Sequence, residues 1–306
     1  MWPVWLWTLL TFLRSLANSD TGILDRPEVR LPAGDNCETT KSSARFPKNG
    51  YKLSRDQRAQ RLLVLMAGRY MGADAPAGCR SGETRLESAQ TATEDGLTVT
   101  TESARLGSRA GVALLKPGTP QWKGNIGFRA EWHGRDWVGL GVERWHGISY
   151  YLPADWHQGE GGPSWNARIV YQFHTSGGPG WSPIYGILVR GDQSNPSWAF
   201  YRKDRYTRSD GGYGYKNTVL WEQPAVVGEW IDFVVHAEWS TDNSGYIQFY
   251  RNRALVYSAS GIRTMTSSNA NMGPYSKWGI YGQPTRILFD EMRIAEGPDQ
   301  LEAVSP

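Results

Sequence analysis

From about residue 96 onward, the chain alternates short apolar or aromatic runs with turn-forming residues. The runs include LTVTTE, GVALLK, IGFRAEW, GISYYL, ARIVYQFH, IYGILVR, TVLWEQP, WIDFVVHAEW, GYIQFYRN, ALVYSA, KWGIYG and RILFDEMRIA. Gly, Pro, Asn and Asp separate them, and Asp242-Asn243-Ser244-Gly245 is a good hairpin turn. About a dozen strands, with no helix of about 10–15 residues between them, predict an all-β sandwich. The jelly roll is the natural large form of such a sandwich.

Two stretches inside this region, residues 154–166 and 191–217, are rich in Gly, polar and aromatic residues. We expect both to be long connections that overhang a groove. The second stretch contains a basic run from Arg202 to Lys216 that is interleaved with tyrosines. Basic residues clustered in one region can bind a polyanion, whereas a solvated loop is the plainer interpretation.

The N-terminal part of the chain has a different pattern. Residues 2–13 are apolar and Ser15-Leu16-Ala17 follows them, which predicts a signal peptide at residues 1–17 and a secreted protein, extracellular or periplasmic. No Lys or Arg precedes the apolar run, which departs from the usual signal, and the run is too short to span a membrane comfortably. Residues 18–95 are expected to form a small, partly helical extension whose role the pattern does not indicate. Its helix begins at Ser54, because Ser54 and Gln57 resemble a capping box. The β-domain is expected at residues 96–306.

Composition narrows the function. The net charge is +3, from 33 basic and 30 acidic residues, which is too balanced for a nucleic-acid binder. Fifteen Trp and fifteen Tyr suit stacking against sugar rings, although a β-sandwich also uses many aromatic residues. Cys37 and Cys79 are the two cysteines; they can form one disulfide in an exported protein or stay as thiols, and they predict no zinc site.

Three runs place polar groups opposite an apolar face when side chains alternate with period two. In FRAEW, the polar face carries Arg129 and Glu131. In ARIVYQFH, it carries Arg168, Val170, Gln172 and His174. In YSKWGIYGQ, it carries Tyr275, Lys277, Gly279, Tyr281 and Gln283. Each face alone has an ordinary explanation, such as a surface histidine, a salt bridge or an edge strand.

Together the three faces supply what β-elimination from a uronate needs, which is removal of the C5 proton followed by loss of the C4 oxygen substituent. Arg and Gln donors on the carboxylate stabilise the enolate-like charge that develops. A base takes the proton and an acid protonates the leaving oxygen. Tyrosine can do either, and its ordinary pKa of about 10 falls beside a cation. Lys277, on the same strand face as Tyr281, is a candidate for that cation.

The ordered motifs RAE, Q-x-H and Y-x-K-x-G-x-Y-x-Q resemble the motif set of jelly-roll alginate lyases. A wider pattern over about residues 105–297 includes ERWHGISYYLPADW, YQFH, GEWIDFVVHAEWS, YSKWGIYG and FDEMRIAEG, and it is more similar to the heparin lyase I and glucuronan lyase group. Ala130, Trp132 and Trp278 depart from a clean alginate-lyase pattern, so the polymer is left open among glucuronan, alginate, heparin-like chains and other uronans.

This resemblance implies a concanavalin A-like jelly roll and a set of residue roles. Arg129 and Gln172 neutralise the carboxylate, while His174 and Tyr281 exchange protons. Lys277 binds substrate or tunes Tyr281. The further substrate-binding candidates are Glu131, Arg144, Arg168, Tyr275 and Gln283. The expected partner is an acidic polysaccharide cleaved by endo action; we expect a monomer, no nucleic acid, no membrane and no required cofactor, with a structural calcium left open.

Two other functions compete with the lyase. A noncatalytic, lectin-like carbohydrate-binding sandwich needs aromatic residues and hydrogen-bond donors, but no proton-transfer groups. A retaining glycosidase needs two carboxylates about 5–5.5 Å apart. The E-x-D-x-x-E strand of jelly-roll glucanases is missing from the sequence, and Asp290 and Glu291 point to opposite faces if they lie on a regular strand. We interpret that pair as an ion pair or as calcium ligands.

Overall fold

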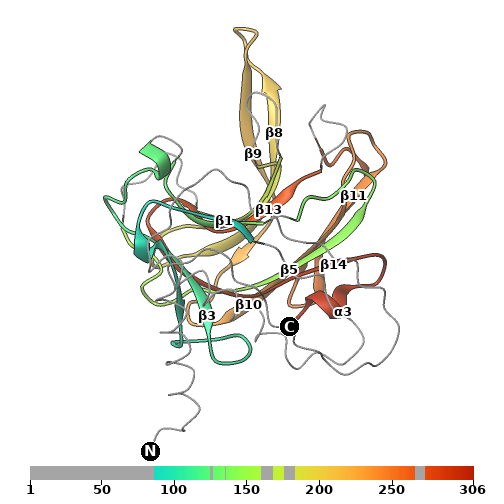
Figure 1. Ribbon diagram of the computed structural model, residues 1–306. Helices are drawn as coiled ribbons and strands as arrows, with labels where there is room; N and C mark the ends of the chain where they lie inside the picture. Colours follow the sequence, from blue (N-terminus) through green and yellow to red (C-terminus); the bar gives the residue numbers. More distant parts are fainter. Residues whose placement is uncertain (1–85, 125–126, 135, 160–167, 176–182, 266–272) are drawn as a thin grey trace, which may run out of the picture. The chain divides into compact units, whose positions relative to one another are not determined.

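Two antiparallel sheets of seven strands each form the part of the protein that the structure describes (Figure 1). The computed structural model describes residues 86–124, 127–134, 136–159, 168–175, 183–265 and 273–306. All of them belong to the second of the chain's two compact units, which begins at Lys52. The predicted signal peptide, the helix expected after Ser54 and the two cysteines lie outside the described residues. The predicted all-β jelly-roll fold is confirmed.

The front sheet carries the candidate site. In spatial order its strands are β1 (Leu86–Thr91), β4 (Arg129–Gly134), β13 (Tyr275–Gly282), β6 (Arg168–His174), β7 (Tyr185–Arg190), β8 (Ser197–Thr207) and β9 (Tyr213–Pro224). The back sheet consists of β12 (Ala254–Ile262), β11 (Gly245–Arg251), β10 (Trp230–Glu238), β5 (Glu143–Tyr151), β14 (Thr285–Glu296), β3 (Ala110–Leu115) and β2 (Leu97–Thr100).

Helical structure among the described residues is short. It consists of two 3₁₀ turns, η1 (Glu94–Gly96) and η2 (Trp122–Gly124), and the helix α3 (Leu301–Val304). None of the helices in the described ranges is long and apolar enough to cross a bilayer.

Two features of the front sheet differ from the sequence pattern. Strand β1 lies before residue 96, where the β-domain was expected to begin, and it pairs with β4. Residues 191–217 are not one long connection, because most of them belong to β8 and β9, which form a long hairpin. Charged residues and exposed tyrosines in the far half of this hairpin hide the strand alternation. Residues 160–167, in the other predicted connection, lie outside the described residues.

Aromatic side chains fill the space between the sheets. Phe200 of the front sheet stacks on Phe249 of the back sheet with ring centroids 4.3 Å apart, and Phe233 stacks on Phe249 at 5.3 Å. In β4 and β13, the alternate residues expected to face inward are part of this core, for example Trp132 and Trp278. The opposite, outer face of the front sheet is therefore left for the polar residues of the same strands.

Strand β6 breaks the predicted alternation at Val170. Its register against β7 shifts between Ile169 and Tyr171, so one residue is extra at this point. Val170 and Tyr171 both face the core, whereas Ile169 joins a small cluster on the outer face. The hydroxyl of Tyr150 in the back sheet donates a hydrogen bond to the Val170 carbonyl oxygen at 2.6 Å. This β-bulge means that Val170 does not share a face with Gln172 as predicted.

Gly279 allows a close approach between β13 and β4. Its φ is +129°, and a Cβ built on it would lie 2.2 Å from the carbonyl oxygen of Ala130. The register of β13 against β6 also shifts here, between Trp278 and Tyr281. A side chain at this position would therefore face both backbone strain and a collision with backbone atoms.

Replacing Gly279 by Ala should lower the free energy of unfolding more than the same change at Gly118. Gly118 also has a positive φ, +79°, but a Cβ there would meet no atom within 4 Å. The backbone strain alone costs about 1–2 kcal/mol, and the collision at Gly279 should add about 1–3 kcal/mol. Urea unfolding of the two variants measures the difference. Equal losses would show that the strands move apart at little cost.

Candidate active site

Polar side chains from four adjacent strands meet on the outer face of the front sheet. The register places Gln90 of β1 opposite Glu131 of β4, and Lys277 of β13 opposite both His133 of β4 and Gln172 of β6. We call the following residues the polar cluster: Gln90, Arg129, Glu131, Gln172, His174, Lys277 and Tyr281. The structure thus brings all four predicted catalytic residues to one face of one sheet.

The buried carboxylate of Glu131 holds two of these residues. Nε2 of Gln172 donates a hydrogen bond to Oε1 of Glu131, and Nη1 of Arg129 lies 3.7 Å from Oε2. An amide nitrogen carries two hydrogens, so Gln172 keeps a second N–H that can donate to another acceptor. Glu131 therefore orients a guanidinium and an amide donor from two different strands.

Gln90 links the two cations of the polar cluster. Its Oε1 accepts a hydrogen bond from Nη1 of Arg129 at 2.9 Å and another from Nζ of Lys277 at 2.9 Å. Because both nitrogens are bound to the same oxygen, they lie at most about 5.8 Å apart. Two buried positive charges at this separation repel each other and favour a bound anion.

The pKa values of the cluster reflect this crowding. Burial lowers the pKa of Lys277 to about 8. The attraction of Glu131 opposes this decrease, and the repulsion of Arg129 contributes to it. Burial raises the pKa of the Glu131 carboxyl, although Lys277, Arg129 and the Gln172 hydrogen bond all oppose the rise. The cluster thus contains two basic side chains, Arg129 and Lys277, and one acidic side chain, Glu131.

His174 is a neutral histidine with a defined tautomer. Burial and the nearby Lys277 lower its pKa to about 3, and Arg129 and His133 contribute to this decrease. The hydrogen bond to the Thr175 carbonyl oxygen opposes the decrease. Nδ1 lies 2.9 Å from the Thr175 carbonyl oxygen, which can only accept, so Nδ1 carries the proton. Nε2 therefore holds the lone pair and is the atom that can accept a proton from a substrate.

The ring of Tyr281 packs between a cation and a glycine. The guanidinium of Arg129 lies 4.8 Å from the ring centroid. A Cβ on Gly127 would lie 2.9 Å from a ring carbon and 3.0 Å from the hydroxyl, so the missing side chain leaves room for the phenol. The cation beside the Tyr281 ring is therefore Arg129. The ammonium of Lys277 instead donates a hydrogen bond to Gln90.

Tyr275 and Gln283 lie at the two ends of β13. The hydroxyl of Tyr275 is 3.0 Å from Nδ1 of His174, and its ring packs against His133 and Trp137 with centroids 4.3 and 4.2 Å apart. Tyr275 therefore orients His174 from one side. Gln283 is buried just after the other end of the strand, and its carbonyl oxygen accepts from the hydroxyl of Thr285.

Arg168 and Arg144 are not brought to the polar cluster. The Val170 bulge turns Arg168 away from the outer face, and its buried guanidinium lies 5.0 Å from the centroid of the core residue Trp156. Arg144 belongs to β5 of the back sheet, where it pairs with Glu296 and donates to the Asp136 carbonyl oxygen at 2.8 Å. These contacts give both arginines structural partners and argue against the substrate-binding role that the resemblance implied.

Two residues near the site, Gln90 and Tyr201, were not assigned to it from the sequence. Gln90 comes from the segment to which no chemistry was assigned, and LESAQT shows no clear strand pattern. Tyr201 of β8 is fully buried beside Ile169 and Tyr281 on the outer face. Burial and the nearby Glu131 and Tyr281 raise its pKa well above the ordinary value. Its hydroxyl has no hydrogen-bond partner within the described part of the chain. In SWAFYR, the large apolar residues Trp198 and Phe200 alternate with Ala199 and Tyr201. This period-two pattern is the signal that would have placed Tyr201 on the outer face.

The acidic pair Asp290 and Glu291 has protein partners. Asp290 accepts from the backbone N–H of Arg105 at 2.9 Å and of Glu291 at 2.8 Å, and Glu291 forms an ion pair with Arg293. Of the two interpretations of this acidic pair, the contacts favour the ion pair. The described ranges contain no group of three or more His, Cys, Asp and Glu side chains that could hold a metal ion.

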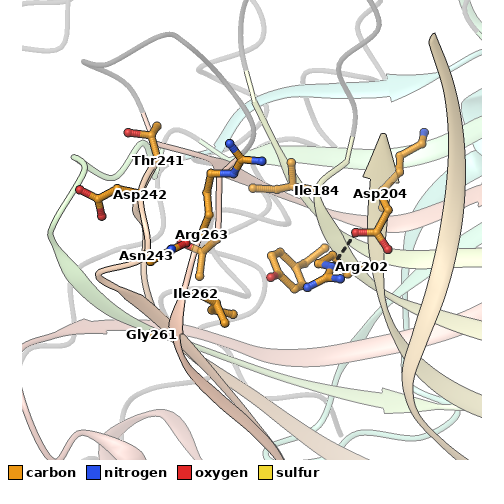
Figure 2. A pocket seen from close by; sticks show the side chains of 12 residues that line it. Ile184, Arg202, Asp204, Thr241, Asp242, Asn243, Gly261, Ile262 and Arg263 are labelled. Carbon is orange, nitrogen blue, oxygen red and sulfur yellow. Dashed lines mark hydrogen bonds and ion pairs between the residues drawn. The ribbon is translucent and has the colours of Figure 1, made fainter. Parts of the chain in front are cut away.

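A cavity of about 480 Å³ lies apart from the polar cluster (Figure 2). Its walls include Tyr185, the Arg202–Asp204 ion pair, and side chains from two loops of the back sheet around Asp242 and Arg263. No member of the polar cluster lines it. The predicted catalytic residues are therefore on the sheet face and not in this cavity, which has basic side chains of its own, Arg202, Lys203 and Arg263.

The polar cluster has a definite chemical capability. Two cations and the free N–H of Gln172 can hold a carboxylate, while His174 and Tyr281 can exchange protons beside it. The low exposure of Glu131, Gln172 and Lys277, each below 5 %, strengthens these electrostatic interactions relative to water.

Comparisons with known proteins agree with this picture. Residues 78–293 match the model of a family described as polysaccharide lyase. Among solved structures, an endo-β-1,4-glucuronan lyase from the fungus Trichoderma reesei is 16% identical with a TM-score of 0.54, covering 72% of this chain and 94% of its own. An alginate lyase from Pseudomonas aeruginosa is 16% identical with a TM-score of 0.46, and the match covers 67% of this chain and 87% of that lyase. An exolytic alginate lyase from Zobellia galactanivorans is 11% identical with a TM-score of 0.48, and the match covers 68% of this chain and 90% of that lyase. No curated protein matched the chain.

The similarity to the glucuronan lyase supports the fold, and the family match covers more than half of the chain, including every member of the polar cluster. The chain belongs to the polysaccharide lyase family and is a polysaccharide lyase.

Proposed function

We propose that this lyase cleaves a uronate-containing acidic polysaccharide by β-elimination and leaves an unsaturated uronate at the new end. The observation that supports this most is the convergence of two buried cations, a neutral histidine and a tyrosine on one sheet face. An acidic sugar supplies a second anion, in addition to Glu131, for the two cations Arg129 and Lys277, and its C5 proton is the one that such a site can remove.

Arg129 and Gln172 contact the uronate carboxylate in this proposal. When the C5–H bond breaks, negative charge spreads from C5 into the carboxylate, and donors already aimed at its oxygens stabilise that charge. Glu131 keeps both donors in place through its two oxygens. Lys277 adds a second positive charge close to Arg129, through their common acceptor Gln90.

His174 and Tyr281 move the protons. A base removes the C5 proton, the electron pair forms the C4–C5 double bond, and the C4–O bond breaks with protonation of the leaving oxygen. In glucuronate and mannuronate, the C5 hydrogen and the C4 oxygen lie on the same side of the ring, so Tyr281 alone can perform both transfers. In their C5 epimers the two lie on opposite sides, so His174 Nε2 is needed as the base.

Other features favour this function over its rivals. A lectin-like sandwich has no need for a buried histidine with an available lone pair or for two cations that repel each other. A glycosidase needs two carboxylates, and the polar cluster contains one, Glu131. The similarity to a glucuronan lyase makes β-1,4-glucuronan the first polymer to test, with alginate and heparin-like chains next. An extracellular substrate also fits the signal peptide expected at residues 1–17.

The proposed function predicts an absorbing, unsaturated uronate product from at least one polymer in a panel of glucuronan, alginate and heparin-like chains. Tyr281→Phe should lower turnover by about 10²-fold or more, because a proton-transfer group is lost, while the Kd for the polymer stays the same. Following absorbance measures turnover, and affinity electrophoresis measures binding. Binding without product from any polymer would favour the lectin-like function.

His174→Ala should separate substrates by stereochemistry. Cleavage at iduronate or guluronate should fall by about 10²-fold or more, whereas cleavage at glucuronate or mannuronate should fall much less. Defined oligosaccharides with one type of uronate at the cleaved bond provide the measurement, and Tyr281→Phe is the control that should affect both types. Equal losses in His174→Ala would mean that His174 only helps to position the carboxylate.

Binding of the acidic chain should weaken above about pH 8, because the pKa of Lys277 is about 8 and the ammonium loses its charge as the pH rises through that value. In Lys277→Arg, the guanidinium stays charged to well above pH 10, so the weakening should disappear. Measuring Kd in the Tyr281→Phe background removes any contribution from catalysis. The same alkaline loss in both proteins would assign it to another group.

A further inference from the structure

The hairpin of β8 and β9 extends beyond the neighbouring strands of the front sheet (Figure 1). We call residues 202–217 the arm. It contains five basic and two acidic residues, a formal charge of +3, which equals the net charge of the whole chain. A two-stranded hairpin outside a sheet gains little stability of its own, so a charged and aromatic arm calls for a function.

One cross-strand row connects the polar cluster with the base of the arm. Lys277 is paired with Gln172, Gln172 with Gly186 of β7, and Gly186 with Tyr201 of β8. Paired residues in neighbouring strands face the same side of a sheet. A Cβ on Gly186 would lie 2.7 Å from the ring of Tyr201, so this ring lies directly over the glycine. The outer face that carries the site therefore continues onto β8 and β9.

Beyond Tyr201, the same face carries a lysine and two tyrosines. Lys203 follows two residues later on β8, and Tyr215 and Tyr213 lie on the facing part of β9, opposite Arg205 and Thr207. Tyr213 is 61% exposed and Tyr215 is 38% exposed. The ammonium of Lys203 lies 5.4 Å from the centroid of the Tyr215 ring. Two positions along a strand advance by about 6.6 Å, so the two rings follow each other at roughly the spacing of sugar rings in a chain.

The opposite face of the arm carries Arg202, Asp204 and Tyr206, of which Tyr206 is 48% exposed. Asp204 accepts from Nε of Arg202 at 2.7 Å and from the hydroxyl of Thr218 at 2.5 Å. Tyr206 lies across Gly214, where a Cβ would be 2.5 Å from the ring. Arg202, Lys203 and Asp204 also line the cavity of Figure 2. The face that continues from the site carries the exposed rings of Tyr213 and Tyr215.

We propose that the outer face of the arm binds the acidic polysaccharide beyond the reacting uronate, with Tyr213 and Tyr215 stacking on sugar rings and Lys203 attracting carboxylates. Tyrosine provides a flat apolar face with a polar end, which suits a pyranose ring, and the charge of the arm is opposite to that of a uronan. This inference rests on the proposed function for its ligand. It assigns the enzyme a preference for long chains over short ones.

The test compares substrate lengths in three variants. The double variant Tyr213→Ser, Tyr215→Ser should raise KM for the polymer by about tenfold, leave kcat unchanged and leave kcat/KM unchanged for the shortest oligosaccharides that are cleaved. The matched double variant Tyr213→Phe, Tyr215→Phe keeps both rings and should retain most of the affinity for the polymer. Tyr206→Ser, on the opposite face of the same hairpin, should have the smaller effect.

Four outcomes would overturn the proposal. The Ser pair (Tyr213→Ser, Tyr215→Ser) could lose kcat/KM equally for short and long substrates, lose it for neither, or change its oligomeric state, or Tyr206→Ser could lose as much kcat/KM for the polymer as the Ser pair.

If the wild-type protein forms no unsaturated product from any polymer, the proposed function fails, but binding still tests the arm. Retention of the wild type by an acidic polymer in affinity electrophoresis, lost in the Ser pair and kept in the Phe pair, would then support the arm as the binding region. Unchanged retention in the Ser pair would overturn it.

Discussion

The site depends on which face of the front sheet each side chain of the central strands occupies. In β6, the bulge at Val170 separates an outward Ile169 from an outward Gln172 by two inward residues. The hydroxyl of Tyr150 crosses from the back sheet to accommodate the displaced carbonyl. In a regular strand of the same sequence, period two would place Arg168 on the same face as Gln172 and move the apolar Ile169 into the core. The bulge thus decides which charges face the substrate.

Interactions between buried charged groups are the second feature on which the polar cluster depends. Arg129, Glu131 and Lys277 sit close together under low exposure, and Gln90 connects the two cations by accepting from both. Removing a charged partner from such a group leaves another charge uncompensated, which costs more than the loss of a surface ion pair. In the proposed function, a bound uronate adds a negative charge to this group. The repulsion between Arg129 and Lys277 is then less compensated in the free enzyme than in the complex.

Much of this arrangement could be predicted from the sequence. Alternation in FRAEW and YSKWGIYGQ assigned Arg129, Glu131, Lys277 and Tyr281 to the outer face, because those strands keep regular alternation. It failed for Arg168, because a bulge leaves no reliable signal in a short apolar run. Gln90 could not be predicted because its strand has few apolar residues. The β8–β9 hairpin was interpreted as a connection because its far half does not contact the core, so its composition resembles that of a loop.

The order of strands in the front sheet has a consequence for how the enzyme comes into being. Strand β13 lies between β4 and β6 in space, yet it follows both by a large part of the chain, and the Lys277–Gln90 hydrogen bond joins residues 187 positions apart. Contacts of such high sequence separation form slowly, since a long loop must close first. A growing chain that has not reached Tyr275 carries Arg129 and His174 on strands that still lack their common neighbour. Catalytic activity therefore reports on the completion of the fold, and a partly folded chain holds the components of the site without the site itself.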